Sequence, residues 1–238
     1  MAYHIGENQS AFVAECLITD NVLVAYEMMS HISKKKKGKC GKMAIKLDMR
    51  KAYDWVEWEC LKQIIKKLGF HEKWISTVMQ CVSLVKYAVR INGQPCGLIQ
   101  PIRGLRQDDP LLPYLFLIWV EGLSALLHHA AQRKAIKGVA ASTNSPRVSH
   151  LFFANDSLVF GRATVNEATE IQRILKVYEA SSGQQLNCHK TSLFFSLNTD
   201  NGIKERVKTM IGAQVIQPHE AYLGLPSLVE RSKNNTFA

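Results

Sequence analysis

Two aspartates hold the positions in this sequence that most favour chemistry. Asp48 closes a stretch of alternating apolar and polar residues, the pattern of a half-buried strand, and precedes an amphipathic helical segment. Asp156 lies between two apolar runs, where a hairpin would turn. Carboxylates that project from neighbouring strand ends suit Mg²⁺, which prefers oxygen ligands and leaves room for water and phosphates. A lone aspartate in a turn is more commonly only a turn former, so each position depends on its neighbours.

The charge of the chain favours an anionic partner. Thirty Lys and Arg against twenty Asp and Glu give a formal net charge of +10, and nucleic acid is the commonest partner of such a surface. The alternative is a basic surface without a dedicated partner. Residues 34–51 include nine basic residues and one acidic residue, Asp48. This cluster could contact phosphates without reading sequence, or be a solvated loop.

The composition is that of a globular protein. With 238 residues, 47% hydrophobic and 21% charged, the chain is long enough for one large domain or two modest ones and is too apolar for general disorder. The most apolar stretch, 111–127, contains Pro113, Glu121 and Gly122, so we expect no membrane span. The six cysteines lack metal-site spacing, and no signal peptide is visible. We therefore expect an intracellular protein, nuclear or cytoplasmic, that is not secreted.

Periodicity predicts helices packed on a mainly antiparallel sheet, an α+β fold. The Asn92-Gly93 pair is a strong hairpin signal, Pro110 suits the first residue of a long helix, and Gly183 suits a helix end. The predicted helices are 11–32 with a break at 19–21, 53–68, 71–82, 110–133, 168–178 and 203–211. The predicted strands are 43–49, 85–91, 96–99, 148–153, 158–160 and 192–195.

Five segments, in order, resemble motifs A to E of the reverse transcriptases of plant non-LTR (LINE-type) retroelements. They are residues 46–58 (KLDMRKAYDWVEW), 104–116 (GLRQDDPLLPYLF), 153–156 (FAND), 182–190 (SGQQLNCHK) and 221–233 (AYLGLPSLVERSK). Residues 9–13 and 17–23 are similar to the fingers segment of the same family. Any one motif would be weak evidence, but five in the family's order and spacing over nearly the whole chain are specific.

The resemblance implies a reverse-transcriptase palm, an antiparallel sheet with packed helices, plus partial fingers. Residues 1–42 would be the partial fingers, and residues 43–238 would be the palm with inserted fingers elements. The implied activity is RNA-directed DNA polymerisation with two Mg²⁺ ions, about 3.5–4 Å apart in such sites. The implied partners are an RNA template, a DNA primer and deoxynucleoside triphosphates, with no membrane.

The resemblance also assigns roles to the residues near the two aspartates. Asp48 and Asp156 would hold the metal ions, and Asn155 stands where the family has its other motif C aspartate. Lys190 would lie near the triphosphate as a charge stabiliser or proton donor, although surface lysines are commonly only solvated. The resemblance therefore places Asp48, Asn155, Asp156 and Lys190 in the catalytic set.

Three further groups border the implied nucleotide and primer. Tyr53 would lie beneath the incoming sugar and exclude a 2′-hydroxyl, although it could also be a core aromatic of an amphipathic helix. Arg106 and Gln107 would border the nucleotide pocket. The segment of Tyr222, Leu223 and Gly224 would hold the primer end.

The sequence departs from the family at constrained positions. Asn155 offers a neutral carbonyl where relatives carry a carboxylate, and losing about 4 kcal/mol of metal-assisted stabilisation would slow the reaction about a thousandfold. Asp108 replaces a motif B glycine and would bring negative charge toward the triphosphate, and Leu112 replaces a serine. Residues 14–16 replace Pro-Gly-Arg, and the earlier fingers segment and the region past motif E are missing. We therefore expect a truncated, degenerate domain with weak or no activity.

Two alternatives remain beside an impaired polymerase. One is a non-catalytic, basic nucleic-acid-binding module derived from the same domain. The other is a palm that does not fold stably by itself, because the apolar faces around residues 115–127 would lack cover and promote aggregation.

Overall fold

A five-stranded sheet forms the centre of the computed structural model, which describes residues 6, 8–13, 16–142, 144–215, 221–222 and 225–226. Its strand order is β4 (His150–Phe153), β5 (Asp156–Arg162), β1 (Lys42–Leu47), β6 (Ser192–Phe195) and β7 (Gln214–Val215). All neighbours are antiparallel except β6 and β7. The predicted α+β class with a mainly antiparallel sheet is confirmed.

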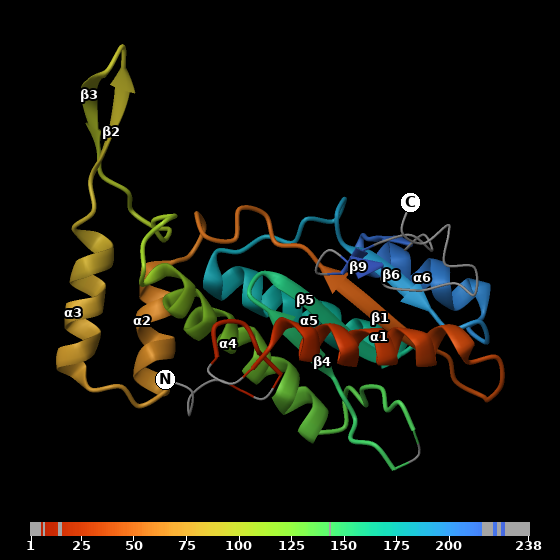
Figure 1. Ribbon diagram of the computed structural model, residues 1–238. Helices are drawn as coiled ribbons and strands as arrows, with labels where there is room; N and C mark the ends of the chain where they lie inside the picture. Colours follow the sequence, from red (N-terminus) through yellow and green to blue (C-terminus); the bar gives the residue numbers. More distant parts are fainter. Residues whose placement is uncertain are drawn as a thin grey trace.

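Helices cover both faces of this sheet (Figure 1). Their bounds are α1 (Ile18–Lys34), α2 (Trp58–Lys67), α3 (Glu72–Ser83), α4 (Leu112–Gln132), α5 (Val165–Ser182) and α6 (Asn201–Ile211). On β1, alternate residues Met43, Ile45 and Leu47 belong to the large core that includes α4 and α5, whereas Ala44 belongs to the smaller core under α1. The alternation predicted for this strand therefore separates two cores.

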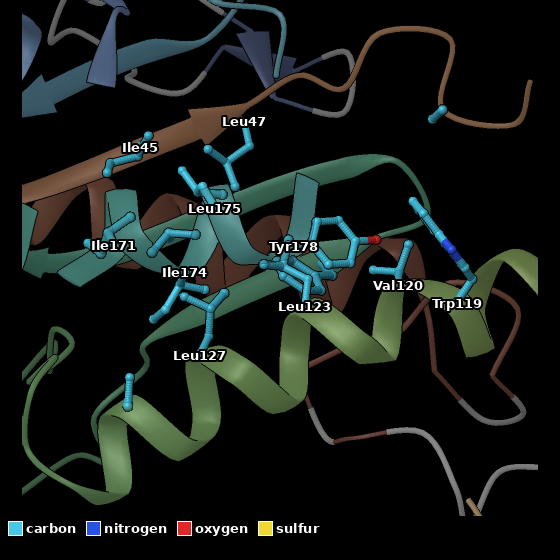
Figure 2. Packing of buried hydrophobic residues seen from close by; sticks show 14 of the residues in the cluster. Ile45, Leu47, Trp119, Val120, Leu123, Leu127, Ile171, Ile174, Leu175 and Tyr178 are labelled. Carbon is cyan, nitrogen blue, oxygen red and sulfur yellow. The ribbon is translucent and has the colours of Figure 1, made fainter. Parts of the chain in front are cut away.

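The large core is built by α5 lying between the sheet and α4. Ile171 and Leu175 of α5 point toward β1, whereas Ile174 points toward Leu127 of α4 (Figure 2). The rings of Trp119 and Tyr178 contact each other with centroids 5.2 Å apart. Helix α4 has the length and hydropathy of a membrane-spanning helix, and more than half of its apolar window is buried here. Burial in the core explains that apolar character.

Two helices begin later than the sequence predicts. Helix α2 begins at Trp58 instead of residue 53, because residues 51–56 form a turn whose carbonyls are used elsewhere. The N–H of Leu105 donates to Tyr53 O at 2.9 Å, and the N–H of Gly104 donates to Val56 O at 2.9 Å. Helix α4 begins at Leu112, two residues after the proposed Pro110, and carries a different proline in its first turn. The Asp109 carboxylate, which accepts from the N–H of Leu111 at 2.8 Å, holds the turn before it.

The segment predicted as a broken helix over residues 11–32 is also corrected. Within its described part, helix α1 begins at Ile18, at the place where the break was expected. The Asp20 carboxylate accepts a hydrogen bond from the N–H of Leu17 at 3.1 Å. Asp20 therefore sits in the first turn and closes the start of the helix rather than capping a second piece.

A hairpin projects away from the rest of the molecule (Figure 1). It consists of β2 (Tyr87–Ile91) and β3 (Gln94–Ile99), and every residue of both strands is exposed. Asn92 and Gly93 both have positive φ, as their position in a two-residue hairpin turn requires. The predicted hairpin is confirmed. Two further short strands, β8 (Ala221–Tyr222) and β9 (Leu225–Pro226), pair near the end of the chain.

Candidate active site

The ends of β1 and β5 bring Asp48 and Asp156 together. The antiparallel register pairs Lys46 with Leu158 and Leu47 with Ser157. Asp48, the residue after Leu47, therefore lies opposite Asp156, the first residue of β5. Residues opposite each other in such a ladder project to the same face, with Cβ atoms about 4.5–5.5 Å apart. The two carboxylates share the sheet face that α1 covers farther along.

The electrostatics of the pair agree with this geometry. Burial and the negative charge of Asp48 raise the pKa of Asp156 above its usual value, and the ammonium of Lys46 opposes that shift. Lys46 lies two residues before Asp48 on the same face of β1. The two carboxylates repel each other, and Lys46 offsets only part of this repulsion. A bound divalent ion would reduce it further.

A loop from the α5–β6 connection holds the Asp48 end of β1 in place. The N–H of Asp48 donates to the hydroxyl of Thr191 at 3.3 Å, and the carbonyl of Asp48 accepts from the N–H of Asn187 at 2.8 Å. The N–H of Arg50 donates to Gln185 O at 2.9 Å. Lys190 lies in this loop, directly before Thr191, and its side chain is exposed. Lys190 therefore lies in the same loop whose backbone and Thr191 hydroxyl hold Asp48 in place.

Tyr53 is half-buried in the turn that follows β1. Its ring contacts Phe116 of α4, with centroids 4.5 Å apart. Burial raises the pKa of its hydroxyl, and the charge of Asp156 raises it further. Tyr53 therefore packs against α4 and also lies close enough to Asp156 to be affected by its charge. The two predictions for Tyr53, a core aromatic and a site residue, are compatible.

Arg106 and Gln107 lie in the loop before α4, and both are exposed. Their position follows from Leu105, whose N–H is bound by the carbonyl of Tyr53. Asp108, next in the loop, has φ of +64°, in the left-handed region that favours glycine. The backbone at this position therefore has the conformation expected of the glycine that the resembled family carries there.

Asn155 lies in the tight turn between β4 and β5 and is exposed, whereas Asp156 is partly buried in the strand. Ala154 has φ of +52°, which turns the chain between the two strands. The sequence predicts Asp156 at the tip of the hairpin, but in the structure it begins β5 and pairs with Phe153. The two neighbours thus differ in exposure.

The primer-end segment is described only in part. Tyr222 belongs to β8, whose backbone pairs Tyr222 with Leu225. Leu223 and Gly224 lie outside the described residues, as do residues 14 and 15.

The donors present fit a divalent cation in part. Asp48 and Asp156 supply two carboxylates on one face, which is the oxygen chemistry that Mg²⁺ prefers. Among the residues that the structure describes, no cluster of three His, Cys, Asp or Glu side chains is close enough to hold a metal ion. The neighbouring position carries the neutral amide of Asn155. The site therefore offers two charged ligands.

The comparisons with known proteins identify the family. The family described as "Reverse transcriptase (RNA-dependent DNA polymerase)" matches residues 1–226. The chain belongs to the reverse transcriptase family. Its relatives place it with the reverse transcriptase domains of non-LTR retroelements. Reverse transcriptases generally use divalent metal ions and bind RNA templates.

Two curated relatives match parts of the chain. An uncharacterized mitochondrial protein of Arabidopsis thaliana is 52% identical over 67 residues, covering 28% of this chain and 55% of the relative. A retrovirus-related Pol polyprotein from the type-1 retrotransposable element R2 of Popillia japonica is 24% identical over 175 residues, covering 73% of this chain and 24% of the polyprotein. The chain therefore spans about half or less of the length of these relatives.

Solved telomerase structures share the fold. The telomerase of Candida albicans, in complex with a fragment of telomeric RNA, is 14% identical with a TM-score of 0.58, covering 91% of this chain and 33% of that one. The apo telomerase of Candida tropicalis, truncated from its C-terminal domain, is 12% identical with a TM-score of 0.56, covering 82% and 37%. At these identities the likeness concerns the fold.

Two residues support Asp48 in ways that the sequence does not predict, since Lys46 is expected only as one of the basic residues of 34–51 and Thr191 is given no role. Lys46 shares the face of Asp48, and the period-two alternation of the strand was the signal that could have shown it. Thr191 binds the N–H of Asp48 through its hydroxyl across 143 positions of sequence. No local sequence pattern predicts a hydrogen bond between residues so far apart in the chain.

Proposed function

We propose that this chain is the palm portion of an RNA-directed DNA polymerase whose own activity is impaired by its substitutions. The observation that carries the proposal is the pairing of Asp48 with Asp156 on one face of the sheet, in a chain of the reverse transcriptase family. The proposed palm comprises residues 43–238, and residues 1–42 are proposed as partial fingers.

Each residue of the site has a proposed task. Asp48 and Asp156 would hold Mg²⁺, which when bound neutralises charge on the reacting phosphate and favours attack at phosphorus. Tyr53 would lie beneath the sugar of an incoming deoxynucleoside triphosphate and exclude a 2′-hydroxyl. Lys190 would donate a proton or stabilise charge at the triphosphate, supported by its position beside Thr191 in the loop bound to Asp48.

The proposed substrates are a DNA primer paired with an RNA template and deoxynucleoside triphosphates. Arg106 and Gln107 would border the triphosphate, since they are exposed in the loop tied to Tyr53. The primer end is proposed to lie against the segment of Tyr222, Leu223 and Gly224. The exposed side chains of Lys34, Lys36, Lys37 and Lys39 add positive charge for binding phosphates without reading sequence.

The proposed impairment has two main sources, and Leu112, in place of a serine hydroxyl, adds a smaller third one. Asn155 supplies no negative charge where the family has a carboxylate, so the cations lose part of their neutralisation. Asp108 adds a charge in the loop next to Gln107, where repulsion of a phosphate at about 5 Å and an effective dielectric near 20 is roughly 3 kcal/mol per unit charge. A loss of about 4 kcal/mol is already about a thousandfold in rate.

Primer extension on an RNA template with Mg²⁺ tests the proposal. The chain is compared with a repaired variant that carries Asn155→Asp, Asp108→Gly and Leu112→Ser. We expect extension only by the repaired variant, and its loss when Asp48→Asn is added. Extension by the unrepaired chain would contradict the impairment, and silence of a folded repaired variant would contradict the assignment of the defect to these three residues.

A second candidate is binding of nucleic acid without catalysis. It is favoured by the exposed amide of Asn155 together with the nine basic residues of 34–51. Binding of a primer–template duplex that weakens steeply with salt, with no extension by the repaired variant, would support it. A slope of log K against log salt near zero would exclude binding through phosphates.

A further inference from the structure

A groove of about 680 Å³ lies beside the C-terminal end of α5. Its wall is formed by α5, by the loop that follows it, by the segment after β1 and by the segment between β3 and α4. The lining residues that matter are Arg50, Trp55, Arg103, Lys176, Glu179 and Gln185. The groove is separate from the acidic pair, because α5 covers the sheet face of Ile45 and Leu47 whereas Asp48 and Asp156 face the α1 side.

A close approach at Gly183 creates one end of the groove. Gly183 has φ of +78°, and a Cβ at this position would lie 2.9 Å from the carbonyl oxygen of Trp55 and 2.6 Å from Glu57 Cγ. Only a residue without a side chain brings the end of α5 this close to the segment after β1. The groove therefore depends on a glycine that the local packing requires.

Positive charge dominates the lining. Arg50 and Lys176 are exposed, and neither forms an ion pair with the described part of the chain. Arg103 pairs with Glu57 at 3.3 Å, and both side chains are about two-fifths exposed, so this ion pair is weak and exchangeable. The acidic lining residue, Glu179, already accepts a hydrogen bond from the N–H of Leu186 at 2.6 Å. Within the described residues, two cations of the groove thus face solvent without an acidic partner.

A stacked pair forms an aromatic platform in the same groove. The guanidinium of Arg103 lies over the ring of Trp55, 4.8 Å from its centroid. An arginine plane held on an aromatic ring presents its outer face to solvent, and nucleobases stack on such planes as well as on the rings themselves. Cations for phosphate and a flat surface for a base therefore occur side by side.

We propose that this groove binds a nucleotide unit outside the catalytic face, with its phosphate on Arg50 and Lys176 and its base on the Trp55–Arg103 platform. The unit comes either from a single-stranded polynucleotide or from a free nucleoside triphosphate. The groove is physically linked to the acidic pair, since Arg50 binds Gln185 through its backbone in the loop that anchors Asp48. The inference does not require polymerisation.

Binding without metal tests this groove. Fluorescence anisotropy of a labelled short oligoadenylate is measured in EDTA, so that the acidic pair cannot hold phosphate through a metal ion. Competition with ATP and with tripolyphosphate distinguishes the two sources: displacement by ATP supports a free nucleotide, and binding without displacement supports the single strand. The variants are Arg50→Ala with Lys176→Ala, Trp55→Leu, and Trp55→Phe.

The control is Arg173→Ala, which removes a positive charge from the same helix outside the groove. We expect the double variant to weaken oligoadenylate binding about tenfold and to reduce the salt slope by roughly 0.7 for each phosphate that is no longer bound. Trp55→Leu should weaken oligoadenylate about tenfold but leave tripolyphosphate binding unchanged, and Trp55→Phe should restore the affinity. Equal losses of affinity in Arg173→Ala and the double variant, or no loss in either, would overturn the proposal.

Primer extension keeps this result separate from the proposed function. Failure of the repaired variant to extend a primer would leave groove binding in EDTA intact. Conversely, unchanged oligoadenylate affinity in the double variant would overturn the proposed binding in the groove without bearing on the proposed role of Asp48 and Asp156.

Discussion

Asp48 and Asp156 lie opposite each other where β1 ends and β5 begins, and the charge of Asp48 adds to burial in raising the pKa of Asp156. Repulsion of this kind is tolerated where a cation offsets it, and Lys46 supplies part of that charge. The repulsion between the two carboxylates therefore costs the fold some stability, as is common at sites that bind a ligand.

The first prediction concerns this pair and pH. The raised pKa of Asp156 means that the folded chain holds this proton more tightly than the unfolded chain does, so its contribution to stability is complete below the unfolded pKa and is lost as pH rises through the folded value. Asp156→Asn should therefore raise Tm at pH 7, and the gain should disappear near pH 3. Thermal melts at both values measure it. Asp54→Asn, an exposed carboxylate of the next loop, is the control and should change Tm at neither value.

The second prediction concerns His150, which is buried on β4. Its ring nitrogens bond to the hydroxyls of Ser124 at 3.1 Å and Ser149 at 2.9 Å. Burial first, and then the charge of His128, lowers the pKa of His150 to about 4. A depressed histidine pKa contributes stability that is present above pH 6.5 and is lost as pH falls toward 4, by about 3 kcal/mol in full.

Urea denaturation between pH 7 and pH 4 measures this loss. His150→Gln should flatten the decline, because the amide cannot take up a proton. A decline equally steep in His150→Gln would show that other groups cause it.

The third prediction concerns the left-handed residue Asp108. Asp tolerates positive φ better than a β-branched residue does, so Asp108→Val should lose about 1–2 kcal/mol of stability and Asp108→Gly should lose none. Asp108→Asn, which keeps that tolerance without the charge, is the matched variant and should resemble the parent. Chemical denaturation gives the order, and a Val variant as stable as the Gly variant would contradict the assigned backbone.

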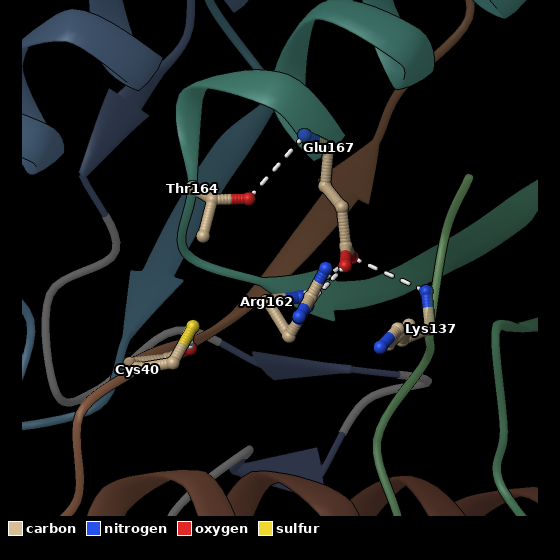
Figure 3. Close-up of polar contacts among 6 residues, drawn as sticks. Cys40, Lys137, Arg162, Thr164 and Glu167 are labelled. Carbon is tan, nitrogen blue, oxygen red and sulfur yellow. Dashed lines mark hydrogen bonds and ion pairs between the residues drawn. The ribbon is translucent and has the colours of Figure 1, made fainter. Parts of the chain in front are cut away.

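The fourth prediction concerns Glu167, a carboxylate of α5 that is 1% exposed. It pairs with the guanidinium of Arg162 and accepts from the N–H groups of Arg162 at 2.8 Å and Lys137 at 3.3 Å, as Figure 3 shows. Glu167→Ala would leave these donors unsatisfied and should cost about 3–5 kcal/mol. Glu170→Ala, which breaks partly exposed pairs one turn along the helix, should cost less than about 1 kcal/mol. Similar losses in the two variants, measured in urea, would refute the network.

Much of the fold could be predicted because its signals are local. The alternation of residues 43–49 and the Asn92-Gly93 turn specify a strand and a hairpin, since each depends on neighbours in sequence. The first residues of the helices are predicted less accurately. The carbonyls of Tyr53 and Val56 bind a segment about fifty residues away, and this tertiary pairing overrides the helical periodicity that begins at Tyr53.

The site shows the same division. Asp48 and Asp156 could be found because each closes or opens a strand, and the register of the ladder then places them together. The support from Thr191, the left-handed backbone of Asp108 and the groove beside α5 depend on interactions between distant segments. Such interactions leave no periodic trace in one sequence, and only the packed structure reveals them.

Metal affinity decides whether Asp48 and Asp156 form a metal site. Mn²⁺, which takes oxygen ligands and can be followed by electron paramagnetic resonance, replaces Mg²⁺ in a titration of the chain, Asn155→Asp, and Asn155→Asp with Asp48→Asn. We expect weak binding by the chain, at least about tenfold tighter binding by Asn155→Asp, and loss of that gain when Asp48 is replaced. Equal affinity in all three proteins would contradict a metal site at Asp48 and Asp156.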